Sequence, residues 1–131
     1  MYTLKLKTRY SETDQGGIVH NSAYILYLEN ARIEFMQQMG VDINALENEG
    51  FLVPVVSQSV KYLRPLKSLE EISVTVKIEH LTNVRFVFSY EIIHDRVKVL
   101  EGQSEHCLLN KHFKPVRLPN NIKEVFLKNY Q

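Results

Sequence analysis

The segment between Arg9 and Arg32 gathers residue types that could hydrolyse an acyl group. It reads RYSETDQGGIVHNSAYILYLENAR, and its carboxylate, Asp14, lies just ahead of a long segment typical of a helix. With a reference pKa of about 4, this carboxylate is ionised at neutral pH. A helix N-terminus has unpaired backbone N–H groups and a partial positive charge, which stabilise an oxyanion. The carboxylate could attack an acyl carbon or activate water, while the N–H groups stabilise the tetrahedral oxygen.

On loop chemistry alone, a structural interpretation of the same loop is the more common one. Asp-x-Gly-Gly is a common turn composition, in which Asp14 only accepts backbone hydrogen bonds. We expect Asn21 or Ser22 to cap the following helix. His20, taken by itself, is more typical of a packed or exposed histidine than of an acid, a base or a ligand. Loop chemistry alone therefore leaves both interpretations of Asp14 open.

The whole chain sets limits on partners and compartment. Its 131 residues suit one domain, residues 1–131, and 44% of them are hydrophobic and 24% charged. Sixteen Lys and Arg against fifteen Asp and Glu leave a net charge of +1, which gives no reason to expect a nucleic-acid partner. The single cysteine, Cys107, excludes an intramolecular disulfide and suits a reducing compartment. Without a signal-like start or an apolar run of membrane-spanning length, we expect a cytoplasmic protein.

The hydrophobic period changes from helical to strand-like along the chain. Residues 22–39 lack Pro and Gly and are followed by Gly40, so they predict a helix with a glycine C-cap. After Pro119, apolar residues recur at helical spacing and predict a short C-terminal helix. Alternating apolar and polar residues predict strands at residues 2–10, 52–62, 72–79, 84–92 and 97–111.

The order of these elements predicts an α+β fold with one domain. The links after residues 81 and 94 are short, so the neighbouring strands should form antiparallel hairpins. One long helix beside a mainly antiparallel sheet is simplest to pack if the sheet curls around the helix.

The first half of the long helix, residues 23–28, is apolar all round, which indicates burial on most sides. Glu29 lies beside this apolar part, where a carboxylate is costly unless it is paired. Arg32 stands three residues later on the same helix, so we expect an ion pair between the two, with a second catalytic carboxylate as the alternative role of Glu29.

The spacing of residues between Tyr10 and Arg32 resembles the signature of a known family. It is similar to the 4-hydroxybenzoyl-CoA thioesterase-like branch of the hotdog-fold acyl-CoA thioesterases. The matching positions are Tyr10-x-x-Thr13-Asp14-x-x-Gly17-x-Val19-x-Asn21-x-x-Tyr24-x-x-Tyr27-x-Glu29-x-Ala31-Arg32. The order of predicted elements also resembles that fold, so the likeness extends over nearly the whole chain.

The resemblance implies a central helix wrapped by a curved, mainly antiparallel five-stranded sheet, plus a short C-terminal helix. Two subunits would pair their sheets edge to edge, with active sites at the interface of a homodimer or homotetramer. Asp14 would act as nucleophile or general base, and the Asn21 N–H would polarise the thioester carbonyl. Tyr10 falls where some members carry a site tyrosine. Several members have histidine in place of Asn21, whereas His20 lies one place earlier, about 100° around a helix.

The same resemblance implies an acyl-CoA substrate and a place for it. Tyr24 would line the acyl pocket, and Gly17 would let the ligand approach the backbone. The best local cations for the phosphates of coenzyme A are Lys61, Arg64, Lys67 and Arg85.

The sequence therefore predicts an acyl-CoA thioesterase that releases a free acid and coenzyme A. Coenzyme A is part of the substrate, so no bound cofactor is expected. No metal site is expected either, because the histidines show no close metal-ligand spacing. Two alternatives stay open. One is a hotdog protein that binds acyl-CoA without turnover, and the other is a hotdog enzyme acting on acyl-carrier-protein thioesters.

Overall fold

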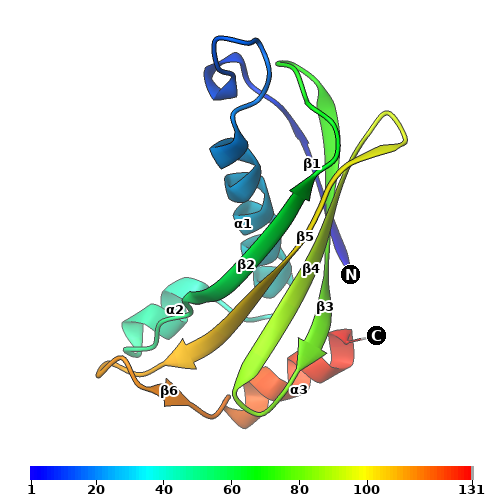
Figure 1. Ribbon diagram of the computed structural model, residues 1–131. Helices are drawn as coiled ribbons and strands as arrows, with labels where there is room; N and C mark the ends of the chain where they lie inside the picture. Colours follow the sequence, from blue (N-terminus) through cyan, green and yellow to red (C-terminus); the bar gives the residue numbers. More distant parts are fainter. Residues whose placement is uncertain (131) are drawn as a thin grey trace.

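The computed structural model describes residues 1–130, whose strands form one open, curved sheet with a long helix across one face (Figure 1). The strands are β1 (Tyr2–Lys7), β2 (Val55–Tyr62), β3 (Glu71–Leu81), β4 (Arg85–His94), β5 (Val97–Leu109) and β6 (Pro115–Val116). The helices are α1 (Asn21–Gln38), α2 (Ile43–Asn48) and α3 (Asn120–Asn129), with a 3-10 turn at Tyr10–Glu12. None of the helices within residues 1–130 is long and apolar enough to cross a membrane.

The sheet has the strand order β1-β3-β4-β5-β2, and every pair in it is antiparallel. The two predicted hairpins, β3–β4 and β4–β5, are confirmed. The predicted strand number of five is wrong, because β6 adds a sixth strand against the end of β5. With only two residues, β6 is too short for alternation to reveal it in the sequence.

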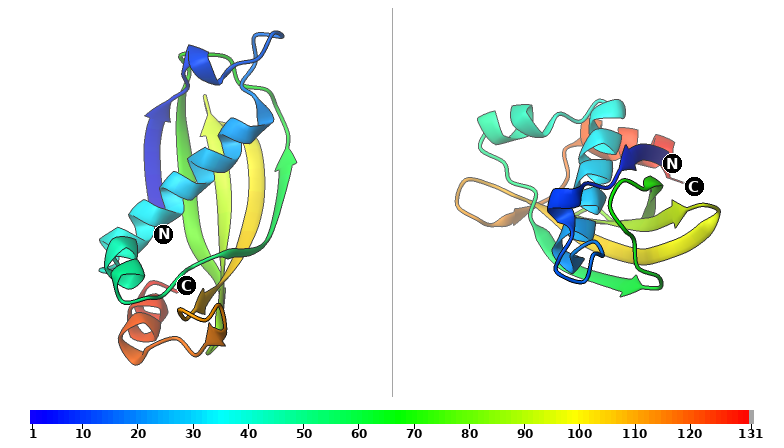
Figure 2. Two further views of the ribbon diagram at one scale, coloured as in Figure 1. Left: turned by 90° about the vertical axis from the view of Figure 1, so that its left-hand side faces the viewer. Right: turned by 90° about the horizontal axis from the view of Figure 1, so that it is seen from above.

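Helix α1 has nearly the predicted length but not the predicted burial. It ends as expected, since Gly40 takes φ 95° and its N–H donates to Gln37 O over 3.0 Å. Its buried residues lie on one face, and Leu26 on the opposite face is 58% exposed. The expectation of burial on most sides is therefore wrong for a single protomer, because the sheet covers α1 from one side only (Figure 2).

Aromatic rings from the C-terminal half of α1, from α3 and from the middle of the sheet meet in the core. The Phe35 ring of α1 lies 6.0 Å from Phe88 of β4, measured between centroids. Phe86 of the same strand lies 4.9 Å from Phe126 of α3. All four rings are at most 2% exposed. Helix α2, which the sequence did not predict, contributes a single buried residue, Leu46.

Strand β2 forms one of the two edges of the sheet, opposite β1, and every residue in it except Val60 is exposed. It approaches β5 very closely at Gly102. A Cβ atom there would lie 2.7 Å from Ser59 O and 2.8 Å from Val60 Cγ1, closer than real contacts allow. Only glycine therefore fits at this crossing of β2 over β5.

Candidate active site

Asp14 lies in a narrow loop that the backbone closes on itself. Thr13 bridges Val19, the Asp14 N–H donates to Ile18 O over 2.9 Å, and the Gly17 N–H donates to Asp14 O over 3.0 Å. Gly17 has φ 79°, a conformation that side chains other than glycine rarely adopt. The loop therefore presents Asp14 in a defined place, just before α1.

The Asp14 carboxylate is only partly used by its own turn. Its Oδ1 accepts the Gly16 N–H over 2.8 Å, as the structural interpretation of the loop requires. Within residues 1–130, no hydrogen bond reaches its second oxygen, Oδ2. The turn bond and a chemical role are therefore compatible, because one oxygen fixes the side chain and the other stays available.

His20 is the N-cap of α1, so the prediction that Asn21 or Ser22 caps the helix is wrong. Both of those residues already belong to the first helical turn. The backbone of His20 is extended, and its Nδ1 accepts the Ser22 N–H over 3.1 Å. In a neutral ring the proton is then on Nε2. The Asn21 N–H, at the first helical position, donates to no acceptor among the described residues.

These residues border one cavity of about 480 Å³ at the N-terminal end of α1. Four predicted site residues line it together: Asp14, His20, Asn21 and Tyr24. Arg64, one of the predicted cations, lies on its wall as well. The structure thus gathers a carboxylate, a histidine, a free helix N–H group and a guanidinium around one space.

Two tyrosines tie this end of α1 to β2 and to the segment that follows it. The Tyr24 hydroxyl accepts the Leu66 N–H over 3.2 Å, and burial raises the pKa of Tyr24. The Tyr24 ring meets Tyr62 edge-on at 5.3 Å, and the Tyr62 hydroxyl donates to Asn21 O over 3.3 Å. Tyr62 was not among the predicted site residues. Its position at the end of a predicted strand was the only available signal.

Glu12 supports the loop from behind. Its Oε1 accepts the Tyr27 hydroxyl over 2.6 Å and the Arg9 N–H over 2.8 Å, and its carbonyl accepts the His20 N–H over 2.7 Å. Burial, followed by the bond to Glu12, raises the pKa of Tyr27. Tyr10 on the same turn is 80% exposed and does not line the cavity in this protomer.

Arg64 is the only one of the four predicted cations that lines this cavity. Lys61 borders a different hollow, of about 660 Å³, together with residues of β3, β4 and β5. Arg85 forms an ion pair of 2.7 Å with Glu105 at the other end of the sheet, where the β3–β4 turn lies (Figure 1). The Lys67 side chain is exposed.

The expected ion pair between Glu29 and Arg32 is not formed within residues 1–130. Glu29 is exposed, whereas Arg32 is buried on the face toward the sheet and its Nη1 has no hydrogen-bond partner. Arg32 lies instead beside His106, a buried histidine of β5. Burial, helped by this guanidinium, lowers the pKa of His106 to about 4.

Two further groups add no site of their own. Cys107 is buried in β5 as expected, and burial raises the pKa of its thiol. Such a thiol is a poor nucleophile, because the reactive form is the thiolate. In the part of the chain that the structure describes, no three His, Cys, Asp or Glu side chains are grouped to hold a metal ion.

Comparison with known proteins places this arrangement in a family. Residues 8–126 match the thioesterase-like superfamily. An acyl-acyl carrier protein thioesterase of Arabidopsis thaliana, ATL2, is 28% identical, and the match covers 95% of this chain and 68% of that protein. A 1,4-dihydroxy-2-naphthoyl-CoA hydrolase of Thermosynechococcus vestitus is also 28% identical, over 86% of this chain and 80% of that protein.

A solved structure extends the likeness to three dimensions. The DHNA-CoA thioesterase of Staphylococcus aureus superposes with a TM-score of 0.93 at 26% identity, covering 97% of this chain and 89% of that one. The match therefore extends over nearly the whole described fold. The chain belongs to the thioesterase-like superfamily and is an enzyme that hydrolyses thioesters.

Proposed function

We propose that this enzyme hydrolyses an acyl- or aryl-CoA thioester to a free acid and coenzyme A, with Asp14 as the catalytic carboxylate. One observation carries the proposal: a carboxylate oxygen of Asp14 and the N–H of Asn21, neither of which is hydrogen-bonded within residues 1–130, border the same cavity. Acyl transfer needs these two parts, a nucleophile or base and a donor for the developing oxyanion.

Two chemical routes use the same geometry. In the first, Asp14 Oδ2 attacks the thioester carbon, the carbonyl oxygen becomes an oxyanion beside the Asn21 N–H, and the thiolate of coenzyme A leaves. Water then hydrolyses the acyl–aspartyl anhydride. In the second, Asp14 takes a proton from water, which attacks the same carbon directly. Both routes end with the same acid and thiol.

The surroundings fit a thioester with a phosphorylated carrier. Arg64 on the cavity wall offers a planar guanidinium, which suits the bidentate binding of a phosphate of coenzyme A. Tyr24 and Tyr62 also line this cavity and offer aromatic surface to the acyl group. The relative from Thermosynechococcus vestitus is named for an aryl-CoA substrate, which supports testing aryl esters first.

We further propose that two copies pair through β2. An exposed edge strand presents unpaired backbone groups, and this edge carries the exposed apolar residues Val55, Val56 and Tyr62. Pairing β2 with its counterpart in a second copy would continue the sheet and bring a second chain beside the cavity. Light scattering during size exclusion should give a dimer or tetramer mass. A monomer mass at micromolar concentration contradicts the pairing.

The thioesterase proposal is tested by thiol release from short-chain, long-chain and aromatic acyl-CoA esters. Asp14→Asn should reduce kcat about 10²–10⁴-fold, because the carboxylate is lost while the turn bond to Gly16 can persist. Asp42→Asn is the matched control, since Asp42 caps α2 and asparagine caps a helix equally well. Substantial turnover by Asp14→Asn would sink the proposed mechanism.

An acyl-carrier-protein substrate is the second candidate, because the Arabidopsis thaliana relative is named for that carrier. An ester carried on phosphopantetheinyl carrier protein therefore belongs in the same panel. Preference for this ester over its coenzyme A counterpart would reassign the carrier but keep Asp14. Tight acyl-CoA binding without turnover of any ester would indicate a binding protein instead.

A further inference from the structure

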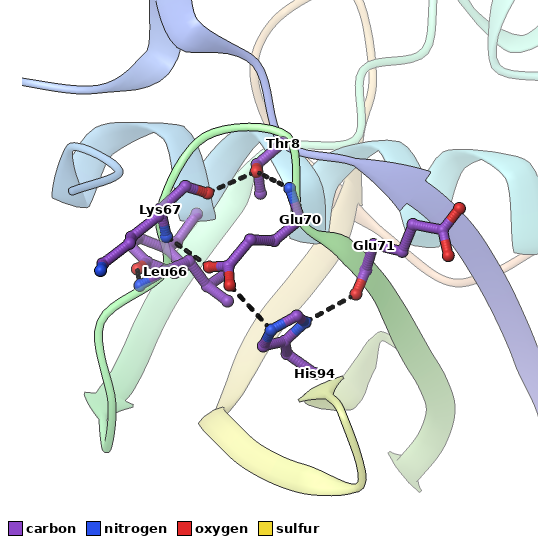
Figure 3. Close-up of polar contacts among 7 residues, drawn as sticks. Thr8, Leu66, Lys67, Glu70, Glu71 and His94 are labelled. Atoms are coloured by element: carbon purple, nitrogen blue, oxygen red, sulfur yellow. Dashed lines mark hydrogen bonds and ion pairs between the residues drawn. The ribbon is translucent and has the colours of Figure 1, made fainter. Parts of the chain in front are cut away.

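His94, the last residue of β4, makes two polar contacts with the segment that enters β3 (Figure 3). Its Nε2 lies 2.9 Å from Glu70 Oε2, and its Nδ1 lies 2.9 Å from the backbone oxygen of Glu71. Neither contact belongs to the ladder of the sheet, and the proposed reaction uses neither residue.

The chemistry of these two acceptors determines the protonation of the ring. A carboxylate and a backbone carbonyl can only accept hydrogen bonds. A neutral imidazole carries one N–H, so it can satisfy one of the two contacts and leaves a lone pair facing the other oxygen. Both contacts are hydrogen bonds only when His94 is the imidazolium.

Glu70 also takes part in a closed ring of hydrogen bonds with Lys67 and Thr8. Its second oxygen, Oε1, accepts the Lys67 N–H over 2.5 Å. The Thr8 hydroxyl oxygen accepts the Glu70 N–H over 2.9 Å, and the same hydroxyl donates to Lys67 O over 2.6 Å (Figure 3). Residues 67–70 are thereby held in one conformation, with Leu69 at φ 63°.

The held segment forms part of the active-site frame. The Val19 N–H donates to Leu66 O over 2.7 Å, and the Leu66 N–H donates to the Tyr24 hydroxyl over 3.2 Å. Arg64 and Pro65, just before Leu66, line the cavity with Asp14. Two sets of hydrogen bonds, joined by the covalent backbone between Leu66 and Lys67, therefore connect His94 to the wall of the cavity.

The charges around His94 favour its cationic form. The carboxylate of Glu70 faces it from the segment before β3, the Glu71 carbonyl from β3 itself, and Asp95 from the turn that follows β4. The bond to the Glu71 carbonyl is the largest cause that raises the pKa of His94; burial opposes it, and Glu70 and Asp95 add smaller upward contributions, so the pKa is raised. No cation among the described residues forms an ion pair with this cluster.

We propose that His94, as the imidazolium, is a positioning residue of the active site, acting through Glu70 to hold residues 64–67 against Val19 and Tyr24. This inference rests on the proposed function, because it assigns the cavity to the substrate. Deprotonation of His94 removes at least one of its two hydrogen bonds and loosens the wall that carries Arg64. The catalytic pair, Asp14 and the Asn21 N–H, stays on its own loop.

The expected signature is a change in KM more than in kcat. If loosening lowers the fraction of binding-competent enzyme to between a third and a tenth, the apparent KM rises about 3- to 10-fold. The change should appear as pH rises through the pKa of His94, since only the imidazolium makes both bonds. An ordinary structural residue would change KM equally at every pH.

Steady-state kinetics from pH 6 to 9 with the best acyl-CoA ester test this directly. His94→Gln should raise KM about 3- to 10-fold over the wild type at pH 6, and the ratio should approach 1 at pH 9. Glu70→Gln keeps an acceptor for the Lys67 N–H but removes the charge, so its KM should be raised and nearly independent of pH. His112→Gln, at an exposed histidine of the β5–β6 turn, is the control and should match the wild type.

Two results overturn the proposal. One is a His94→Gln effect on KM that is constant from pH 6 to 9. The other is an NMR titration in which His94 loses its proton at or below a pKa of about 6.5, the reference value. The NMR measurement does not depend on turnover. If no ester is hydrolysed, the proposed function fails, while the titration still decides whether His94 is held as the imidazolium.

Discussion

The two ends of α1 differ in their surroundings: polar groups border a cavity at one end, and aromatic rings are packed at the other. At the N-terminal end, one oxygen of Asp14 and the N–H of Asn21 have no hydrogen-bond partner among the described residues and border a cavity. Toward the C-terminal end, aromatic rings fill the space between helix and sheet. Unpaired polar groups are tolerable where solvent or substrate can reach them and costly where neither can. The first end is therefore suited to chemistry and the second to stability.

Two histidines show the same contrast. His94, near the open end, faces two acceptors and needs both of its protons. His106, in the core, lies between one acceptor and one donor. Its Nδ1 donates to Pro54 O over 3.0 Å, and its Nε2 accepts the Ser104 hydroxyl over 2.7 Å. That hydroxyl in turn accepts the Tyr90 O–H, so the neutral ring completes the network. The hydrogen-bond partners of each histidine therefore determine whether its ring is neutral or protonated in the folded protein.

The largest effect should come from opening the packed end. Phe88→Ala removes a fully buried ring that contacts Phe35, Phe86 and Phe126, so it should lower the free energy of unfolding by about 3–5 kcal/mol. Urea denaturation measures the change. Leu26→Ala, on the exposed face of α1, should change it by about 0.5 kcal/mol or less. Equal losses in both variants would mean that the two faces of α1 do not differ as described.

At the N-terminal end of α1, removal of a single backbone N–H, that of Asn21, should lower kcat strongly. Asn21→Pro deletes the N–H but suits the helix, because proline is favoured at the first helical position and His20 before it is already extended. We expect kcat to fall about 10²–10³-fold with unchanged unfolding free energy. Asn21→Ala keeps the N–H and should stay within a few-fold of wild type. Loss of activity in both variants would instead assign the role to the side chain.

Acid should weaken the packed end through His106. The pKa of His106 is lowered to about 4 in the fold, so below pH 6.5 the unfolded chain binds this proton and the folded chain does not. Stability should therefore fall as pH drops from 6.5 toward 4, with a slope of at most about 1.4 kcal/mol per pH unit from this group. His94, with a raised pKa, contributes with the opposite sign and loses its contribution as pH rises.

Chemical denaturation at several pH values separates the two histidines. His106→Gln should be less stable than wild type at pH 7, and its stability should fall less steeply between pH 6.5 and 4. Parallel curves for variant and wild type would show that His106 does not titrate differently in the folded chain.

The smallest effect should come from the backbone of the held segment. Leu69 is 69% exposed and adopts φ 63°, which is unfavourable for a leucine. Leu69→Asn should raise the free energy of unfolding by about 0.5–1 kcal/mol, because asparagine tolerates this region. Leu69→Val is the matched control and should lower it. A loss in both variants would show that the Leu69 side chain stabilises the segment by contact.

The sequence predicted the elements well because their periods are local. The helix ending before Gly40, the two hairpins and α3 follow from spacing and turn chemistry. Helix α2 and β6 were missed, since six and two residues carry too little pattern. The strand number was therefore predicted wrongly. The prediction that α1 is buried on most sides was also wrong, because the sheet covers one face of the helix and leaves Leu26 exposed.

For the candidate site, the sequence could name residues that share one loop but not those that meet by folding. Asp14, His20 and Asn21 are close in the chain, and their grouping was predictable. Arg64 reaches the same cavity from beyond β2, whereas Lys61 and Arg85 do not. The direction of a strand residue depends on register, and a bulge between Val55 and Ser57 shifts the register of β2. The roles of all these residues stay predictions until they are tested.

Gly102 has a consequence for any attempt to diversify this enzyme. Strand β2 lies too close to Gly102 for a Cβ atom. The position of β2, which leads toward the cavity, therefore depends on a site that accepts only glycine. In a saturation library selected for folded protein, codons other than glycine should vanish at position 102, while the exposed positions of β2 should accept most residues. Searches for altered substrate preference should therefore randomise β2 and keep Gly102 unchanged.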